Sequence, residues 1–175
     1  MESNQELERL IVRRMDVTDI DSVMHVEHKA NSHGWRRRTF EDSLQLNHEC
    51  WVVVDPYTSS YTIAHSVLGC EVDSAELYNI SVDPAYQGRG VGRMLLNHML
   101  TRSRTMPVDR VFLEVRVSNE RAIKLYQSVG FKQVGVRKDY YQHDKWGRED
   151  AYVLALRQYA EPDERDISIE SVNSW

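Results

Sequence analysis

The stretch Gln87-Gly-Arg-Gly-Val-Gly-Arg93 decides the fold, because it places three glycines between a segment that reads as a strand and one that reads as a helix. Glycines at such a junction let backbone N–H groups converge on an anion at the positive end of the helix, where a phosphate fits. The spacing is not a dinucleotide-binding fingerprint, since Arg93 or Leu95 stands where the third glycine would be, and no P-loop Gly-Lys-Ser/Thr follows. The alternative is a tight glycine turn with Arg89 and Arg93 solvated.

The segment that follows this loop has the pattern of a helix lying on a sheet. Its apolar stripe recurs at i, i+3, i+4, i+7 and i+8, with Val91, Met94, Leu95, His98 and Met99. The next segment alternates with period two, so Glu114 points away from the face that carries Val111, Leu113 and Val115. A strand, helix, strand, helix unit implies a right-handed parallel crossover in an otherwise mostly antiparallel sheet.

The whole chain is expected to fold in the order βααβββαβαββ. A capping-box pattern at Thr18-Asp-Ile-Asp21 is expected to start the first helix, and Thr39 to cap a second helix that ends near residue 47. Gly130 is expected to end the last helix as a left-handed C-cap, and residues 142–148 to form a polar loop. The expected strands are 10–12, 51–54, 61–72, 77–82, 111–117, 132–137 and 151–156, and the other two helices begin at 90 and 119. The predicted fold class is α/β with a mixed sheet.

The glycine loop and the strand before it resemble the GNAT superfamily of N-acetyltransferases. Asn79-Ile-Ser-Val-Asp-Pro84 and the following Tyr86–Gly92 are similar to its acetyl-CoA motif, Gln/Arg-x-x-Gly-x-Gly/Ala. The fixed places of that motif hold Gln87, Gly90 and Gly92. Four later blocks resemble the RimI subfamily, the ribosomal-protein-alanine N-acetyltransferases: Phe112–Asn119, Ala122–Phe131, Asp139–Tyr141 and Gly147–Asp150. The similarity spans residues 75–157, and the N-terminal half agrees only in outline.

The resemblance implies a GNAT fold whose sheet splays at an acetyl-CoA site. Backbone groups of Ile80–Val82 would bond the pantetheine arm as an added strand does, and Gly88–Arg93 would hold the pyrophosphate. Asn119 would hydrogen-bond the pantetheine, although it is equally suited to cap a helix. The implied cofactor-binding residues are Ile80, Ser81, Val82, Gln87, Gly88, Arg89, Gly90, Val91, Gly92, Arg93 and Asn119. Acetyl-CoA is the expected cosubstrate, and no metal is implied.

Acetyl transfer from a thioester to an amine needs an unprotonated nucleophile. A peptide α-amine, with a pKa of about 7.7 to 8.0, loses its proton more easily than a lysine side chain, at about 10.4, by roughly 3 to 4 kcal/mol. Glu114 is the expected general base, because an acidic residue within an apolar strand needs a task or a partner and the family has a glutamate base there. The alternatives are an ion pair with Arg116 and a partly exposed strand face.

The thiolate that leaves needs a proton or a hydrogen bond, and Tyr126 matches the family tyrosine that supplies it. Its neighbours at helical spacing are apolar, so the alternative is a core aromatic residue with its hydroxyl at the rim. A phenol of pKa about 10 protonates a thiolate of conjugate pKa about 8.5 uphill by about 2 kcal/mol. Tyr126 is therefore expected to act mainly as a hydrogen-bond donor to the sulfur.

Three weaker signals concern the acceptor side and the charged motifs. Trp35, Tyr140 and Tyr141 are expected to wall an acceptor-peptide groove on the family resemblance alone, with plain packing as the alternative. His25-Val-Glu27-His28 contains His-x-Glu but no zinc-deaminase cysteines follow, so it is interpreted as a solvated helix face. The run Arg36–Arg38 is interpreted as solvated rather than bound to a CoA phosphate or ribosomal RNA.

The composition indicates one domain with an acidic end. The 175 residues carry 22 Lys and Arg against 27 Asp and Glu, a net charge of -5. Residues 1–160 form the expected acetyltransferase domain, and residues 161–175, with five acidic residues and one arginine, form an expected disordered tail. Two cysteines argue against a disulfide framework, and apolar runs such as Cys50–Val54 are too short to span a membrane. The polar N-terminus favours the cytoplasm, and the net acidity argues against nucleic-acid binding.

The sequence thus predicts an enzyme that acetylates the N-terminal amine of a protein. The resemblance implies alanine on a small-subunit ribosomal protein as the acceptor. Direct attack on acetyl-CoA is favoured, because no Cys or Ser stands in a recognisable nucleophile pattern. The alternatives are a lysine or small-molecule amine acetyltransferase of the same fold, and a non-catalytic CoA-binding, ribosome-associated module.

Overall fold

A computed structural model describes residues 7–58, 61–145 and 147–159 of the chain, so the acidic segment 161–175 lies outside the described residues. The strands are β1 (Ile11–Arg14), β2 (Glu49–Asp55), β3 (Tyr61–Cys70), β4 (Ala75–Val82), β5 (Arg110–Arg116), β6 (Lys132–His143) and β7 (Gly147–Arg157). The helices are α2 (Ile20–Ala30), α3 (Arg37–Gln45), α4 (Val91–Ser103) and α5 (Glu120–Ser128), with 3-10 turns at Val17–Asp19 and Pro84–Tyr86. This order confirms the predicted βααβββαβαββ. In the part of the chain that the structure describes, none of the helices is long and apolar enough to cross a membrane.

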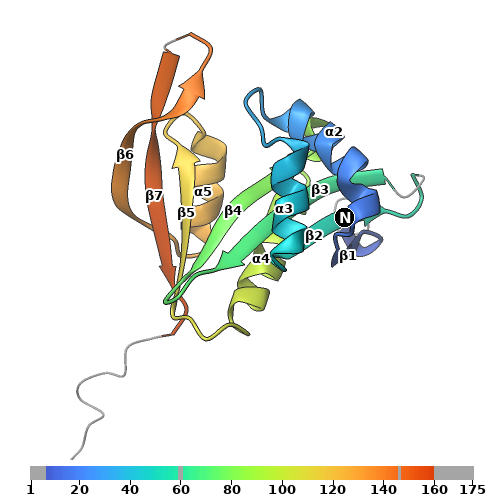
Figure 1. Cartoon of the computed structure of the whole chain (residues 1–175), viewed down its shortest axis with the longest axis horizontal. Coiled ribbons are helices and arrows are strands. Elements are labelled where there is room, and N and C mark those ends of the chain that lie inside the picture. Colours follow the sequence, from blue (N-terminus) through green and yellow to red (C-terminus); the bar gives the residue numbers. More distant parts are fainter. Residues whose placement is uncertain (1–6, 59–60, 146, 160–175) are drawn as a thin grey trace, which may run out of the picture.

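The strands form one mixed sheet, in the order β1-β2-β3-β4-β5-β7-β6, with helices packed on both of its faces (Figure 1). Because side chains alternate along β2, Val53 packs in the apolar cluster that includes α4 and Tyr126 of α5. Val52 and Val54 pack in the other cluster, with Val23 of α2 and Phe40 of α3. Helices α4 and α5 therefore cover one face of the sheet, and α2 and α3 cover the other.

The sheet opens between β4 and β5, which pair in parallel as the crossover through α4 predicted. Their pairing runs only from Ala75 opposite Val111 to Leu77 opposite Leu113. Beyond that point β4 continues to Val82 and β5 to Arg116 on diverging courses, and Figure 1 shows the two halves of the sheet separating toward the top of the view. The later part of β4 therefore has a backbone edge that β5 does not use.

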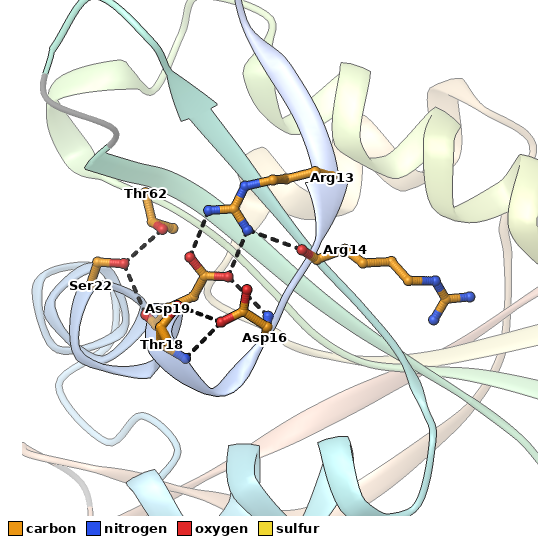
Figure 2. Close-up of polar contacts among 7 residues, drawn as sticks. All are labelled: Arg13, Arg14, Asp16, Thr18, Asp19, Ser22 and Thr62. Carbon is orange, nitrogen blue, oxygen red and sulfur yellow. Dashed lines mark hydrogen bonds and ion pairs between the residues drawn. The ribbon is translucent and has the colours of Figure 1, made fainter.

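The junction between β1 and α2 is fixed by polar contacts that the sequence analysis placed elsewhere. Arg13 donates two hydrogen bonds of 2.7 Å to the carboxylate of Asp19, which also accepts from the backbone N–H of Asp16 at 2.9 Å (Figure 2). Asp16 in turn accepts from the backbone N–H of Thr18 at 2.7 Å. The capping box is thus Asp16 with Asp19, and the predicted box at Thr18–Asp21 is wrong because a 3-10 turn precedes the helix.

Two other predicted boundaries are also wrong. Helix α3 begins at Arg37, so Thr39 lies within its first turn instead of capping it. Most of the expected loop 142–148 is strand, because Gln142 and His143 of β6 pair with Arg148 and Gly147 of β7. Much of this hairpin is exposed and therefore polar. A polar stretch without alternating apolar residues is typical of a loop, so the sequence predicted a loop at 142–148.

Candidate active site

A cavity of about 300 Å³ lies between the end of β4, the glycine loop and α5. The predicted cofactor residues that line it are Ile80, Ser81, Val82, Gln87, Gly88, Gly90, Gly92, Arg93 and Asn119. Two predicted residues do not line it. Val91 is only 2% exposed and packs in the core, and the guanidinium of Arg89 lies 5.5 Å from the ring centroid of Tyr86. The structure thus brings together most of the cofactor residues that the resemblance implied.

The glycine loop has the backbone geometry that an anion site at a helix N-terminus requires. Gly88 and Gly90 have φ of 81° and 92°, in the left-handed region, and Gly90 is the N-cap of α4. Gln87 supports the loop, since its Nε2 donates to the carbonyl of Val82 at 3.0 Å. The Oε1 of Gln87 accepts from Arg121 at 3.1 Å.

Arg121 is a residue at this cavity that the sequence analysis missed. It lies in the first turn of α5, lines the cavity and directs its guanidinium at Gln87 beside the glycine loop. A cation there complements a phosphate. Nothing local in the sequence marks Arg121, because its position depends on the packing of α5 beside the loop.

A second cavity of about 140 Å³ adjoins the first on the side of α2, β5 and β6. The residues that line both cavities are Asn31, Ile80, Ser81, Asn119 and Tyr126. The two cavities therefore meet where β4 ends and α5 begins. An arrangement of this kind can hold two reactants with their reactive ends together.

Glu114 lines the second cavity from β5, with 13% of its side chain exposed. Its carboxylate pairs with the guanidinium of Arg137 on β6. A hydrogen bond to Glu114, followed by burial, raises the pKa of Tyr140 to about 12. The alternative of an ion pair with Arg116 is wrong, because Arg116 lies 3.1 Å from Glu149 instead. Two residues of β6 thus hold the Glu114 carboxylate at the cavity.

Tyr126 lies where the two cavities meet and is 7% exposed. Burial, followed by the neighbouring Tyr141, raises its pKa above the ordinary value for tyrosine. Its ring packs against Phe131 at 5.9 Å between centroids, as a core aromatic residue would. The raised pKa means that the phenol keeps its proton at neutral pH, so its hydroxyl is able to donate a hydrogen bond and unable to act as a base.

Asn119 caps α5, as one of the two predictions for it expected. Its Oδ1 accepts from the backbone N–H of Ala122 at 3.2 Å, whereas the hydroxyl of Ser118 donates to Glu149 at 3.1 Å. Asn119 also lines both cavities, so its contact with pantetheine stays a prediction.

The three aromatic residues predicted for the acceptor side separate into two groups. Trp35 and Tyr141 line the second cavity. Trp35 packs on Phe40 at 5.2 Å between centroids, and the hydroxyl of Tyr141 donates to the carbonyl of Glu114 at 3.2 Å. Tyr140 is 42% exposed and packs edge-on against Tyr141, outside the lining of that cavity.

The motif His25–His28 is not a solvated helix face, so that interpretation is wrong for Glu27. Glu27 is 1% exposed and lines the second cavity. It shares a face of α2 with Ile20 and Val23, both fully buried, at i+7 and i+4. The signal for its burial in the sequence is that this carboxylate lies on an apolar helical stripe, in line with Ile20 and Val23.

The other charged motif is the run Arg36–Arg38, which lies at the start of α3. Arg36, Arg37 and Arg38 are exposed as expected, and the Nε of Arg38 pairs with Asp42 at 2.9 Å. Within residues 7–58, 61–145 and 147–159, no group of three or more His, Cys, Asp or Glu residues is arranged to hold a metal ion.

Comparison with known proteins decides the family. The model of the acetyltransferase (GNAT) family matches residues 20–131. This chain belongs to the GNAT family. One similar solved structure is the crystal structure of the ribosomal-protein-S18-alanine N-acetyltransferase from Escherichia coli. It matches this GNAT chain with a TM-score of 0.79 and 32% sequence identity, over 89% of this chain and 97% of the Escherichia coli chain. The predicted fold class is therefore confirmed.

Two relatives of this GNAT protein carry the name ribosomal protein bS18-alanine N-acetyltransferase. The protein from Salmonella typhimurium strain LT2 is 37% identical over 145 residues, which are 81% of this chain and 93% of the relative. The protein from Escherichia coli strain K12 is 36% identical over 148 residues, 83% of this chain and 95% of the relative. The resemblance to the RimI subfamily is confirmed by these relatives.

Proposed function

We propose that this GNAT protein transfers the acetyl group of acetyl-CoA to the N-terminal amine of alanine on a small-subunit ribosomal protein. The observation that carries the proposal is the meeting of two cavities at Tyr126, with Glu114 in the second one. The named activity of the relatives supports the ribosomal acceptor. The ribosomal protein is then the partner, and the cytoplasm is the proposed location.

Acetyl-CoA would occupy the first cavity. The pantetheine arm would lie along the edge of β4 that β5 leaves unpaired, at Ile80–Val82, and pair with its backbone groups. The pyrophosphate would lie on the glycine loop, where Gly88 and Gly90 are left-handed and α4 begins, and where the free N–H groups of a helix N-terminus would bind it. Arg93 and Arg121, which line the same cavity, would add positive charge.

The acceptor amine would enter through the second cavity. Glu114 would take its proton, directly or through water, while the amine nitrogen attacks the thioester carbon. The new N–C bond replaces the C–S bond, and the sulfur leaves as a thiolate that accepts a hydrogen bond from the Tyr126 hydroxyl. Arg137 and Tyr140 would hold Glu114 in the orientation that this proton transfer needs.

The test compares two peptides that differ in which amine is free. Acetyl-CoA turnover is measured with a peptide that begins with alanine and lacks lysine, and with an N-blocked peptide that contains lysine. Turnover of the first peptide alone is the expected result. Turnover of the blocked peptide alone would assign the protein to the lysine acetyltransferases, and acetyl-CoA binding with no turnover of any amine would leave a non-catalytic module.

A further inference from the structure

Glu27 is a buried carboxylate that the proposed chemistry does not use. Its Oε1 accepts from the backbone N–H of Trp35 at 2.9 Å and from the Nδ2 of Asn79 at 3.1 Å. Its Oε2 accepts from the hydroxyl of Ser81 at 2.8 Å and lies 3.3 Å from the Nε2 of His65. The carboxylate of this α2 residue therefore connects the segment after α2 with β3 and β4.

These contacts lie along one side of the second cavity. Glu27, Trp35, Asn79 and Ser81 all line it, and Ser81 also lines the first cavity. Ser81 accepts a further hydrogen bond from Asn31 at 3.0 Å, and Asn31 also lines both cavities. The network therefore reaches the place where the proposed cosubstrate and acceptor meet.

The carboxylate is ionised, which strengthens each of these contacts. Burial opposes its ionisation, but the imidazole of His65 and then the donors Trp35 and Ser81 outweigh burial and lower the pKa of Glu27 to about 2. Hydrogen bonds to an ionised acceptor are roughly twice as strong as neutral ones. At neutral pH, the ionised Glu27 therefore holds the segment that carries Trp35 by a charge-assisted hydrogen bond.

Gly34 shows how closely that segment approaches the carboxylate. A Cβ atom added at Gly34 would lie 2.8 Å from both the Cγ and the Oε1 of Glu27. Only a residue without a side chain fits there unless Glu27 moves. The segment that carries Trp35 therefore packs directly against the side chain of Glu27.

We infer that Glu27 is a positioning residue for the acceptor: it fixes Trp35 against β4 and so sets the wall on which the acceptor N-terminus lies. The inference rests on the proposed function in taking the second cavity as the acceptor site. Glu27 acts through its neighbours, because its side chain is almost fully buried and both oxygens already have partners.

Steady-state kinetics of Glu27→Ala test the inference. The KM for the acceptor peptide is expected to rise about tenfold or more, with the KM for acetyl-CoA within about twofold of the wild-type value, because the lost anchor belongs to the acceptor wall. Glu27→Gln is expected to keep the acceptor KM within about threefold, since its carbonyl oxygen still accepts from Trp35. Equal rises in both KM values would overturn the inference.

Glu49→Ala is the matched control for loss of stability. Glu49 is a carboxylate with 14% of its side chain exposed, paired with Arg14 and Arg102, and it lines neither cavity. Its variant is expected to lower Tm while leaving the acceptor KM unchanged. If Glu27→Ala behaves in the same way, Glu27 has a structural role only and the inference fails.

Gly34→Ala gives a second test through the same contact. Its methyl group is expected to displace the Glu27 carboxylate and raise the acceptor KM in the same direction. In the double variant the methyl group occupies space that Glu27→Ala vacates, so the acceptor KM is expected to be no higher than in Glu27→Ala alone. If the rise in acceptor KM in the double variant equals the product of the rises in the two single variants, the contact between Glu27 and Gly34 is contradicted.

Hydrogen exchange of the Trp35 amide separates this inference from the proposed function, because it needs no acceptor. Exchange is expected to be faster in Glu27→Ala and unchanged in Glu49→Ala. Unchanged exchange in Glu27→Ala would overturn the inference even in an active enzyme. If the proposed function is wrong, the wild-type protein does not turn over the alanine peptide. The KM values of the variants are then compared with the amine that the protein does acetylate.

Discussion

The hydroxyl of Tyr126 is expected to matter for turnover more than for binding, because it stabilises charge that develops on the sulfur only as the C–S bond breaks. Tyr126→Phe should lower kcat about 10²- to 10³-fold, as loss of one preorganised donor does, and change the KM for acetyl-CoA about twofold at most. Tyr159→Phe is the control, since Tyr159 is 53% exposed and donates to the carbonyl of Arg104. Unchanged turnover in Tyr126→Phe would show that the Tyr126 hydroxyl does not stabilise the leaving sulfur.

The carboxylate of Glu114 is expected to shape the pH dependence of the reaction. Glu114→Gln should lower kcat/KM at neutral pH about 10²-fold or more. The remaining activity should climb with pH as the acceptor amine, with a pKa of about 8, loses its proton unaided. Glu76→Gln is the control, because Glu76 is a neighbouring carboxylate that lines neither cavity. A wild-type profile of kcat/KM between pH 6 and 10 would contradict the assignment.

At the scale of single elements, the sequence predicted the strands and helices whose periodicity is strong and local. The alternation of Val111, Leu113 and Val115 placed Glu114 on the opposite face of β5, and these three valine and leucine side chains are buried. Gly130 has a φ of 103°, as a left-handed C-cap requires. These features depend on a few neighbouring residues, so a single sequence reveals them.

Other features depend on contacts between distant residues, and the sequence did not reveal them. Arg137 pairs with Glu114 because β6 folds back along β7, and Glu27 finds its partners on β3 and β4. Charged residues in such networks look like surface residues in the sequence, because their partners are far along the chain.

The glycine loop is expected to tolerate no side chain at Gly90. Alanine there must adopt a φ of 92°, and its Cβ would lie 3.1 Å from the Cδ1 of Leu7. Gly90→Ala should lower stability by about 1 kcal/mol and weaken acetyl-CoA binding about tenfold or more, because the N–H groups at the start of α4 turn away. Calorimetric Kd values for acetyl-CoA, together with Tm, measure both effects.

Gly147→Ala is the matched control for Gly90→Ala. Gly147 also has a positive φ, of 74°, but a Cβ there meets nothing within 4 Å, and Gly147 lies at the β6–β7 turn. Its variant should show a similar loss of stability and an unchanged Kd for acetyl-CoA. Equal losses of affinity in the two variants would mean that backbone strain, rather than the loop, weakens binding.

At the scale of the whole molecule, one topological feature explains why the sites lie together. Parallel pairing of β4 with β5 ends after three residue pairs, so the two halves of the sheet diverge with α5 beside the opening. The glycine loop follows β4 and reaches the opening from one side. Glu114 and Tyr141 line the second cavity from the other half of the sheet, so the opening brings residues of both halves to one place.

Two ion networks on opposite sides of β2 and β3, one around the buried Glu27 and one around the partly exposed Glu49, are expected to make the stability of the whole molecule depend on acid pH. The pKa of Glu27 is lowered to about 2, as is that of Glu49, where the hydrogen bonds from Arg102, Trp51 and Arg14 outweigh burial. In the unfolded chain both carboxyls return to a pKa of about 4.3, so the unfolded state binds protons first as the pH falls.

Each carboxylate should therefore stabilise the fold fully above about pH 5 and lose that contribution as the pH falls from about 4.5 to about 2. The contribution of the buried Glu27 is up to about 3 kcal/mol, whereas solvent screening makes the contribution of the partly exposed Glu49 network smaller. Urea midpoints of the wild-type protein and of Glu27→Gln and Glu49→Gln, measured from pH 7 to pH 2.5, test this. The variants should be less stable than the wild type at pH 7, and the gap should close toward pH 2.5. A gap that stays constant with pH would show that the glutamines lose packing rather than ionic contacts.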